Sequence, residues 1–341
     1  MSLMSSAIRA VERIPLPDPV TRAGIGLLVQ RTRRTLADAS DNEEGDFAQA
    51  MAARPIAEHA DTANAQHYEL PLEFFALTLG PRRKYSCCLY PTGGETIEEA
   101  ERLALEETIA HAGLADGQSI LELGCGWGSL TLFMAERFPS ATITAVSNSK
   151  PQRLYIEAEA AVRGLGNVRV VTADMNTFNP DSTYDRIVSV EMFEHMSNWR
   201  TLLERIRAWL TPRGRLFVHV FSHRRSPYRF DHGNDADWIA RHFFTGGIMP
   251  SHGLIRRFPD YFVVEHDWRW NGLHYQKTAI DWLARFDQNR ERIDRIFDDV
   301  YGADAALWRR RWRLFYQATA GLFGYYGGEE WGVSHYLLRP T

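Results

Sequence analysis

The sequence predicts an α/β fold in which helices cover both faces of a mostly parallel sheet. Short apolar runs alternate with helical patterns between about residues 115 and 222, and a glycine-rich turn follows the first run. Strands that alternate with helices in this way are typical of βαβ units. With 341 residues, 45% of them apolar, the chain can build one such domain with a substantial addition.

Composition excludes several classes of protein. The formal net charge of −4 gives no global reason to expect a nucleic-acid partner. Three cysteines cannot build a disulfide framework, which favours a reducing compartment. No apolar run approaches the ~20 residues of a membrane span, and no apolar leader is evident at the N-terminus. We therefore expect a cytoplasmic protein without a membrane span.

Residues 1–94 are expected to form a helical extension and an active-site lid. Residues 5–55 have the pattern of one or two amphipathic helices, separated by the proline-rich stretch Pro15–Pro19. Further along, aromatic, hydroxyl and thiol groups lie among turn formers at His67–Pro71 and Tyr85–Tyr90. Such a segment can close over a pocket. A plain packed extension is the alternative.

Residues 95–223 are expected to form the α/β core. A charged helical pattern from Glu95 to His111 precedes the first strand, and a turn at Pro212–Gly214 precedes the last. The five expected strands are Ile120–Leu123, Ala141–Val146, Val168–Ala173, Tyr184–Val190 and Arg215–Phe221. Ligands of such sheets bind beyond the carboxyl ends of the strands.

Residues 224–341 are expected to hold a cap insertion and the C-terminal part of the fold. The predicted elements are a helix near Asp235–Phe244, a turn at Gly246–Pro250, a strand at Tyr261–Trp270, helices at 275–290 and 304–322, and a final antiparallel strand at Trp331–Leu338.

The turn after the first strand contains glycine at positions 124, 126 and 128. Glycine leaves room for a ligand against the backbone, and the N–H groups that open the next helix can hold an anionic group. By itself this G-x-G-x-G pattern fits a nucleoside-cofactor site and also an ordinary strand-to-helix turn.

Together with this turn, other motifs resemble a known family. Glu122 before the glycines, Asp174 after the third strand and the βα series resemble the class I S-adenosylmethionine-dependent methyltransferases. More narrowly, the chain resembles the superfamily of cyclopropane-fatty-acid synthases and mycolic acid methyltransferases, at Tyr85–Cys88, Leu123–Gly128, Ser147–Lys150 and Phe193–His195. Within it, the chain is most similar to plant coclaurine-type N-methyltransferases, at Glu191–Met196, Phe323–Tyr325 and Gly328–Trp331.

The resemblance implies a class I methyltransferase Rossmann-like fold and S-adenosyl-L-methionine as cofactor. It implies cofactor contacts at Tyr85, Ser86, Glu122, Gly124, Gly126, Gly128, Ser147, Asn148, Gln152 and Asp174. Asp174 is the expected partner of the adenine amino group, and a helix N-cap is its alternative role. Many methyltransferases bind the ribose with an acidic residue where this chain has Ser147 and Asn148. No His/Cys spacing suggests a metal site.

Three ionisable groups follow the fourth strand within five residues: Glu191, Glu194 and His195. A single Glu-His pair is common at a helix start, but this density favours acid–base chemistry. We therefore predict all three as catalytic groups, with His195 as the base and a glutamate orienting it. The residues predicted to bind substrate are Cys87, His219, Tyr325 and Trp331. His219 could equally be a hydrogen-bonded core histidine.

The predicted function is N-methylation of a small, alkaloid-like amine. Lipid-modifying relatives bind bicarbonate with a small residue at the place of Glu191, and a carboxylate there repels an anion. The alternatives are a cyclopropane-fatty-acyl-phospholipid synthase or lipid C-methyltransferase acting on an acyl chain, and a non-catalytic S-adenosylmethionine-binding module. The sequence leaves open whether the chain forms a homodimer.

Overall fold

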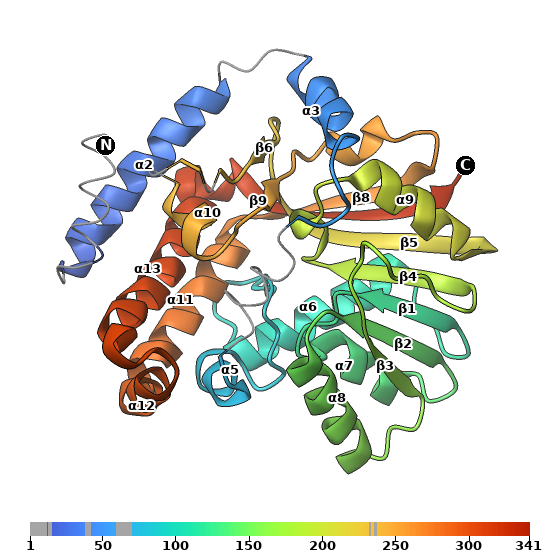
Figure 1. Ribbon diagram of the computed structural model, residues 1–341, viewed down its shortest axis with the longest axis horizontal. Coiled ribbons are helices and arrows are strands. Elements are labelled where there is room, and N and C mark those ends of the chain that lie inside the picture. The colour runs from blue at the N-terminus through green and yellow to red at the C-terminus, as the bar shows by residue number, and fades with distance from the viewer. Residues whose placement is uncertain (1–11, 13–15, 38–41, 59–69, 232, 235–236) are drawn as a thin grey trace.

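The computed structural model contains a seven-stranded sheet flanked by helices (Figure 1). It describes residues 12, 16–37, 42–58, 70–231, 233–234 and 237–341. The part of the expected lid at His67–Glu69 lies outside these ranges.

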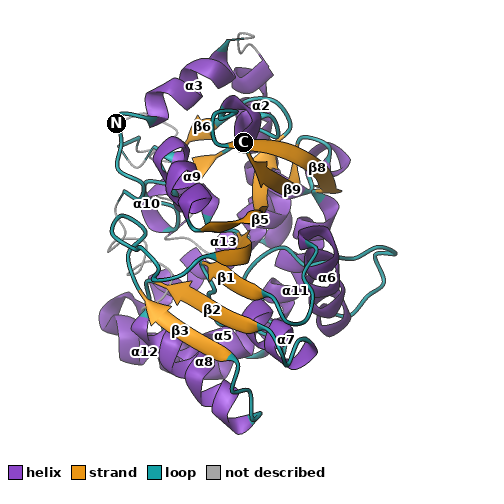
Figure 2. Cartoon of the chain, turned by 90° about the vertical axis from the view of Figure 1, so that its right-hand side faces the viewer, coloured by secondary structure: helices purple, strands orange, loops and turns teal. Residues whose placement is uncertain are grey.

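The sheet has the strand order β3-β2-β1-β4-β5-β9-β8. Figure 2 shows β3, β2 and β1 side by side, with β5, β9 and β8 farther along. The strands are β1 Ser119–Leu123, β2 Thr142–Ser147, β3 Val168–Thr172, β4 Tyr184–Val190, β5 Leu210–His223, β8 Phe262–Asn271 and β9 Trp331–Pro340. Strands β1 to β5 pair in parallel, and β9 pairs antiparallel with both β5 and β8. The predicted parallel series and final antiparallel strand are confirmed.

Helices cover both faces of this sheet because successive strand side chains point to opposite sides. Ile120 and Val188 pack with α6 (Ile97–Ala112) and α7 (Ser129–Arg137), and α8 (Lys150–Val162) lies on the same face. Their chain neighbours Leu121 and Ile187 pack instead with α9 (Trp199–Ala208) and α3 (Glu43–Met51). The doubly wound arrangement is therefore confirmed.

The remaining helices pack beyond the carboxyl ends of the strands. They are α2 (Asp18–Ala37), α5 (Leu72–Thr78), α11 (Leu273–Gln288), α12 (Arg290–Tyr301) and α13 (Ala305–Phe323), at the left of Figure 1. Their apolar cluster is centred on the fully buried Trp312, whose ring lies 4.8 Å from that of Phe74. It also includes Trp127, in the turn after β1, and Phe221, near the end of β5. The terminal parts of the chain thus enclose the ligand-binding edge of the sheet.

Two local predictions are wrong. The expected turn at Pro212–Gly214 is part of β5, where the pairing register with β4 shifts. A Cβ at Gly214 would lie 2.9 Å from the Tyr184 carbonyl oxygen, so glycine allows the two backbones to approach. The expected turn at Gly246–Pro250 contains β7 (Ile248–Met249), paired with β6 (Tyr228–Arg229).

The other segments are short. Helix α10 spans Trp238–His242. Single 3₁₀ turns occur at Phe193–His195, Leu254–Arg257, Gly302–Asp304 and Tyr325–Gly328. Among the described residues, no helix has the length and hydropathy needed to cross a bilayer.

Candidate active site

A pocket of about 800 Å³, counting space open to solvent, lies beyond the carboxyl ends of β1, β2, β3 and β4. Eight of the predicted site residues line it: Gly124, Gly126, Ser147, Asn148, Gln152, Asp174, Glu191 and His195. Its other walls are Ala57, Glu58, Val146, Ala173, Met175, Met192, Met196 and Thr245. The structure therefore brings together residues from four separate strand ends, as the parallel sheet requires.

The three glycines of the first turn have different structural requirements. Gly124 has φ +81°, and a Cβ there would lie 2.6 Å from the Met192 Cβ. Gly128 has φ +75°, and its Cβ would collide with Ile156 at 2.5 Å. Gly126, at φ +52°, has no atom within 4 Å of a built Cβ. Because Gly126 also lines the pocket, its missing side chain leaves space there for a ligand.

Gln152 offers an unused hydrogen-bond donor to the pocket. The Ser147 hydroxyl donates to Gln152 Oε1 at 2.6 Å, which fixes the amide orientation. Gln152 is buried, and its Nε2 has no partner among the described residues. A buried amide donor without an acceptor is costly, so this nitrogen indicates a ligand oxygen. Asn148 lies exposed on the same side of the pocket.

Asp174 lies exposed at the pocket rim. Its Oδ1 accepts from the Asn176 backbone N–H at 2.8 Å and from the Asn176 side-chain amide at 3.0 Å. Asp174 thus closes a turn after β3, and no α-helix begins there. The alternative N-cap role is therefore wrong.

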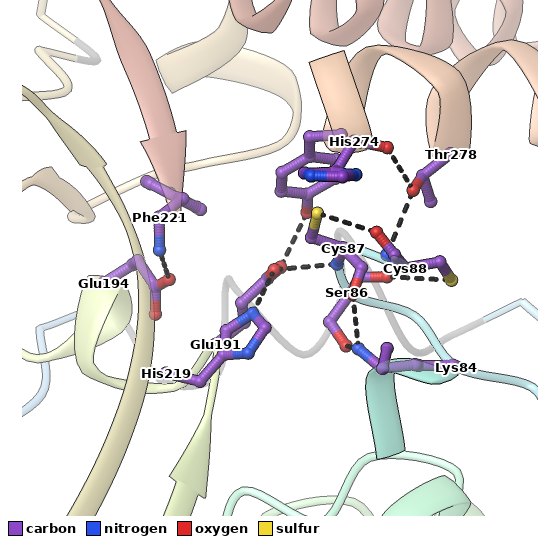
Figure 3. A network of polar contacts seen from close by, with 12 residues as sticks. Lys84, Ser86, Cys87, Cys88, Glu191, Glu194, His219, Phe221, His274 and Thr278 are labelled. Atoms are coloured by element: carbon purple, nitrogen blue, oxygen red, sulfur yellow. Dashed lines mark hydrogen bonds and ion pairs between the residues drawn. The ribbon is translucent and has the colours of Figure 1, made fainter. Parts of the chain in front are cut away.

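Glu191 is held by hydrogen-bond partners from three separate segments (Figure 3). Its Oε1 accepts from the Cys87 backbone N–H at 2.8 Å and lies 3.2 Å from His219 Nε2. Its Oε2 accepts from the Tyr275 hydroxyl at 2.6 Å. The side chain is only 8% exposed, and burial raises the pKa of its carboxyl group. Glu191 also has φ +49°, a strained conformation for a residue with a Cβ.

Glu194 and His195 lie in the 3₁₀ turn after β4 but differ in position. His195 lines the pocket and stacks on Phe244, with ring centroids 4.5 Å apart. Glu194 is fully buried and is not among the pocket walls; its Oε1 accepts from the Phe221 N–H at 2.7 Å. Burial, and then the nearby Glu191, raise the pKa of Glu194 well above its ordinary value.

Four predicted cofactor residues are not among the described pocket walls: Gly128 of the turn described above, Tyr85, Ser86 and Glu122. The Ser86 hydroxyl accepts from Lys84 Nζ at 2.5 Å, and the Tyr85 ring packs against Trp282. Glu122 is buried below the glycine turn, where the Thr131 hydroxyl donates to it at 2.5 Å and burial raises its pKa to about 8. In this structure Glu122 supports the turn. Direct cofactor contact by these residues stays a prediction.

The predicted substrate residues are not among the pocket walls either. Cys87 contacts Glu191 through its backbone N–H, and burial raises the pKa of its thiol. His219 is fully buried beside Glu191. Trp331 is fully buried and donates to the Tyr228 hydroxyl at 3.2 Å, with the Tyr325 ring 6.0 Å away. His219 is thus the hydrogen-bonded core histidine that the sequence left open, yet it faces a site carboxylate.

Sequence reasoning missed three residues. Tyr275 donates to Glu191, but its helical spacing gave no sign of this contact. His335 contacts His219 from the last strand, at 2.8 Å. Glu58 lines the pocket, accepts from the Ser197 hydroxyl at 2.7 Å and forms an ion pair with Arg229. Each contact joins segments distant in the chain.

Within the described ranges there is no cluster of three or more His, Cys, Asp or Glu side chains suited to a metal ion.

The raised pKa of Glu194 predicts a pH-dependent stability. The folded state binds the Glu194 proton more tightly than the unfolded state does. This proton therefore stabilises the fold fully at a pH below the pKa of Glu194 in the unfolded state, and the stabilisation is lost as the pH rises through the pKa in the folded state. Relative to Glu194→Gln, the wild type should lose at least about 1 kcal/mol of unfolding free energy between pH 5 and 8. Chemical denaturation of both proteins measures this. Glu204→Gln, at an exposed site on α9, is the control. A difference independent of pH would contradict the account.

Comparison with known proteins agrees with this geometry. The family model described as mycolic acid cyclopropane synthetase matches residues 57–325. The (S)-coclaurine N-methyltransferase of Thalictrum flavum subsp. glaucum is 38% identical over 289 residues, which cover 83% of this chain and 80% of that protein. The cyclopropane-fatty-acyl-phospholipid synthase of Escherichia coli (strain K12) is 28% identical over 256 residues, which cover 72% and 64%.

A solved structure matches almost the whole chain. The crystal structure of coclaurine N-methyltransferase bound to N-methylheliamine and SAH has a TM-score of 0.95 and 33% sequence identity. The match covers 99% of this chain and 100% of that one. SAH is the product form of S-adenosylmethionine, the cofactor that fits the open space at Gly126 and the unpaired Gln152 donor. The chain belongs to the mycolic acid cyclopropane synthetase family and is an S-adenosylmethionine-dependent N-methyltransferase.

Proposed function

We propose that this enzyme methylates the nitrogen of a secondary or tertiary amine in a mid-sized, partly aromatic, alkaloid-like molecule. The observation that carries the proposal is that Glu191 and His195 both line the pocket. A carboxylate attracts an ammonium group, and an imidazole accepts a proton near neutral pH. Relatives named for coclaurine methylation support the same acceptor class.

We infer that Gly124, Gly126, Asn148, Gln152 and Asp174 hold the cofactor. Gly126 leaves open space, Gln152 Nε2 is an unused donor, and Asp174 is an acceptor at the rim. When bound, S-adenosylmethionine supplies an electrophilic methyl group on a sulfonium. The protein then has to align the amine nitrogen and keep its lone pair free.

His195 is suited to remove the amine proton. Most alkylamines are protonated at pH 7, and a protonated nitrogen has no lone pair to be methylated. His195 lines the pocket, and its stacking on Phe244 fixes the plane of the imidazole. Glu194 precedes it in the same 3₁₀ turn, tied to the Phe221 N–H, and so positions the turn. We therefore assign His195 as the base and Glu194 as a positioning residue.

The geometry at Glu191 disfavours the lipid alternative. An anion such as bicarbonate needs donors, and Glu191 Oε1 already accepts from the Cys87 N–H and lies within hydrogen-bond distance of His219 Nε2. Bicarbonate would compete for the Cys87 donor, and its negative charge would oppose the ionised form of Glu191 that an amine cation favours. The same carboxylate attracts an amine cation, which supports amine methylation over acyl-chain chemistry.

We also propose a cytoplasmic location. The three cysteines are free and buried, two of them adjacent in the chain, as suits a protein of a reducing compartment.

The acceptor class is tested by mass spectrometry with methyl-labelled S-adenosylmethionine. Purified protein receives cyclic secondary and tertiary amines beside unsaturated phospholipids, with and without bicarbonate. We expect label in the amines alone, at a rate unaffected by bicarbonate. Bicarbonate-dependent label in the lipid would overturn the proposal and establish the alternative chemistry.

Replacing the base predicts a specific pH profile. His195→Asn should lower kcat by roughly 10²-fold at pH 7, the range of general-base catalysis. Activity should recover as the pH approaches the pKa of the amine, because the neutral form then arrives from solution. His266→Asn, an exposed histidine on β8, is the matched control and should behave as wild type. Equal activity of both variants at pH 7 would remove His195 from the mechanism.

Two glycine variants separate cofactor binding from folding. Gly126→Ala should weaken S-adenosylmethionine binding at least tenfold, because its methyl group enters open pocket space, while the φ of +52° should cost only about 1 kcal/mol of unfolding free energy. Gly128→Ala should instead cost about 1–3 kcal/mol of unfolding free energy, through the collision with Ile156 and the strained φ. Calorimetric binding and denaturation measure the two effects. The same pattern in both variants would show that the glycines share one role.

A further inference from the structure

A continuous line of side-chain contacts connects Glu191 with the protein surface through three histidines. His219 Nε2 lies 3.2 Å from Glu191 Oε1, and His219 Nδ1 lies 2.8 Å from His335 Nε2. His335 Nδ1 lies 2.8 Å from His111 Nδ1, and His111 Nε2 lies 3.0 Å from Glu107 Oε1. Every ring nitrogen in this series faces another member of it. We refer to His219, His335 and His111 as the histidine relay.

Backbone geometry fixes the order of the relay. His219 and His335 are directly paired residues of the antiparallel strands β5 and β9. His111 and Glu107 are four residues apart on α6, where side chains at this spacing meet. The contacts therefore follow from strand register and helix period, and do not depend on a mobile loop.

The inner relay is shielded from water. His219 and His335 are fully buried, and the Trp270 ring lies 4.4 Å from that of His335. Burial lowers the pKa of both histidines well below the ordinary value, so both are neutral near pH 7. His111 is stacked on Trp268, with ring centroids 3.8 Å apart and planes within 8°. Burial lowers the pKa of His111 as well, while the facing Glu107 carboxylate raises it. Because this carboxylate and the indole face both stabilise a cation, His111 is the relay position best suited to carry charge.

Neutral histidines impose a direction on this series. A neutral imidazole has one donor and one acceptor nitrogen. The Glu107 side chain is 42% exposed and carries a carboxylate, so it accepts a hydrogen bond from His111 Nε2. His111 Nδ1 must then accept from His335 Nδ1, and His335 Nε2 from His219 Nδ1. His219 Nε2 is left as an acceptor that faces Glu191 Oε1, so Glu191 must supply a proton.

We propose that Glu107 sets the proton state of Glu191 through the histidine relay, so that Glu191 is neutral at rest and ionises when an ammonium group enters the pocket. The ionisation step rests on the proposed amine substrate. The resting state requires only the contacts within the protein.

Ionisation of Glu191 moves one proton at each contact. The Glu191 proton passes to His219 Nε2, the His219 Nδ1 proton to His335 Nε2, and the His335 Nδ1 proton to His111 Nδ1. Glu191 is then an anion facing the ammonium group. His111, at this stage an imidazolium paired with Glu107, releases its Nε2 proton to water and is left neutral and protonated at Nδ1. Departure of the cationic product returns one proton from water to His111 Nε2 and reverses the same transfers, which restores each tautomer.

Other titratable groups near Glu191 act in opposing directions. Lys84, which donates to Ser86 Oγ and the Cys87 carbonyl, favours the Glu191 carboxylate. Glu194 and Glu191 each disfavour ionisation of the other. The Tyr275 hydroxyl donates to Glu191 Oε2, and the buried Cys87 thiol remains protonated. This balance allows an arriving cation to decide the proton state of Glu191.

Histidine tautomers test the resting state without any substrate. In protein labelled with ¹⁵N at histidine, long-range ¹H–¹⁵N spectra distinguish protonated Nδ1 from protonated Nε2; single His→Gln variants assign the signals. We expect His219 and His335 to be neutral and protonated at Nδ1, with His111 protonated at Nε2. Protonation of His219 at Nε2 in the wild type would overturn the proposal.

A surface substitution reverses the direction of the relay. In Glu107→Lys the residue at position 107 donates to His111 Nε2, so His219 and His335 should both change to the Nε2-protonated tautomer. Glu106→Lys is the matched control: Glu106 is on the same helix, has the same 42% side-chain exposure and pairs with Arg102. The control should leave all three tautomers unchanged. Tautomers that do not change in Glu107→Lys would overturn the proposal.

Proton release on binding tests the ionisation step. The probe is N,N-dimethyl-1,2,3,4-tetrahydroisoquinolinium, a permanent cation without an N–H, so a released proton must come from the protein. Titration calorimetry in buffers of different ionisation enthalpy should give close to one proton released by wild type and by Glu106→Lys, and none by Glu107→Lys. Binding without proton release by the wild type would overturn this step. If the probe did not bind at all, both the ionisation step and the proposed amine site would be overturned. The tautomer measurements would still test the resting state by themselves.

Discussion

The site depends on one buried carboxyl group with hydrogen-bond partners from three parts of the chain. Glu191 forms hydrogen bonds with the segment before α6, with β5 and with α11, through Cys87, His219 and Tyr275. Its backbone is strained, at φ +49°. Such a conformation persists only where its surroundings hold it. The N-terminal segment, the sheet and the C-terminal helices must therefore all be in place before the amine site is complete.

Much of the pocket could be predicted from sequence because a parallel sheet collects its strand ends at one edge. This rule and the family motifs predicted that Gly126, Gln152, Asp174, Glu191 and His195 lie together, and all five line the pocket. The alternation of strands with helices likewise predicted the two covered faces. The family motifs then identified the cofactor. The glycine-rich turn alone had left open whether the site binds a cofactor at all.

What the sequence did not predict are contacts between elements that are distant along the chain. Tyr275 and His335 lie in segments with ordinary helical and strand patterns, and His335 meets His219 only through a register between strands 116 residues apart. A similar limit explains Pro212–Gly214, whose composition is typical of a turn although tertiary pairing continues the strand there. Residue types alone also could not separate the pocket-lining His195 from the buried Glu194 next to it.

The central claim is that Glu191 gives this pocket its preference for an amine cation. The most direct test compares the binding of two ligands of similar shape, N,N-dimethyl-1,2,3,4-tetrahydroisoquinolinium and the uncharged 2,2-dimethyltetralin, to wild type and to Glu191→Gln. The account predicts that the wild type binds the cation at least tenfold more tightly than the hydrocarbon, and that most of this preference is lost in Glu191→Gln. An equal preference in both proteins would contradict it.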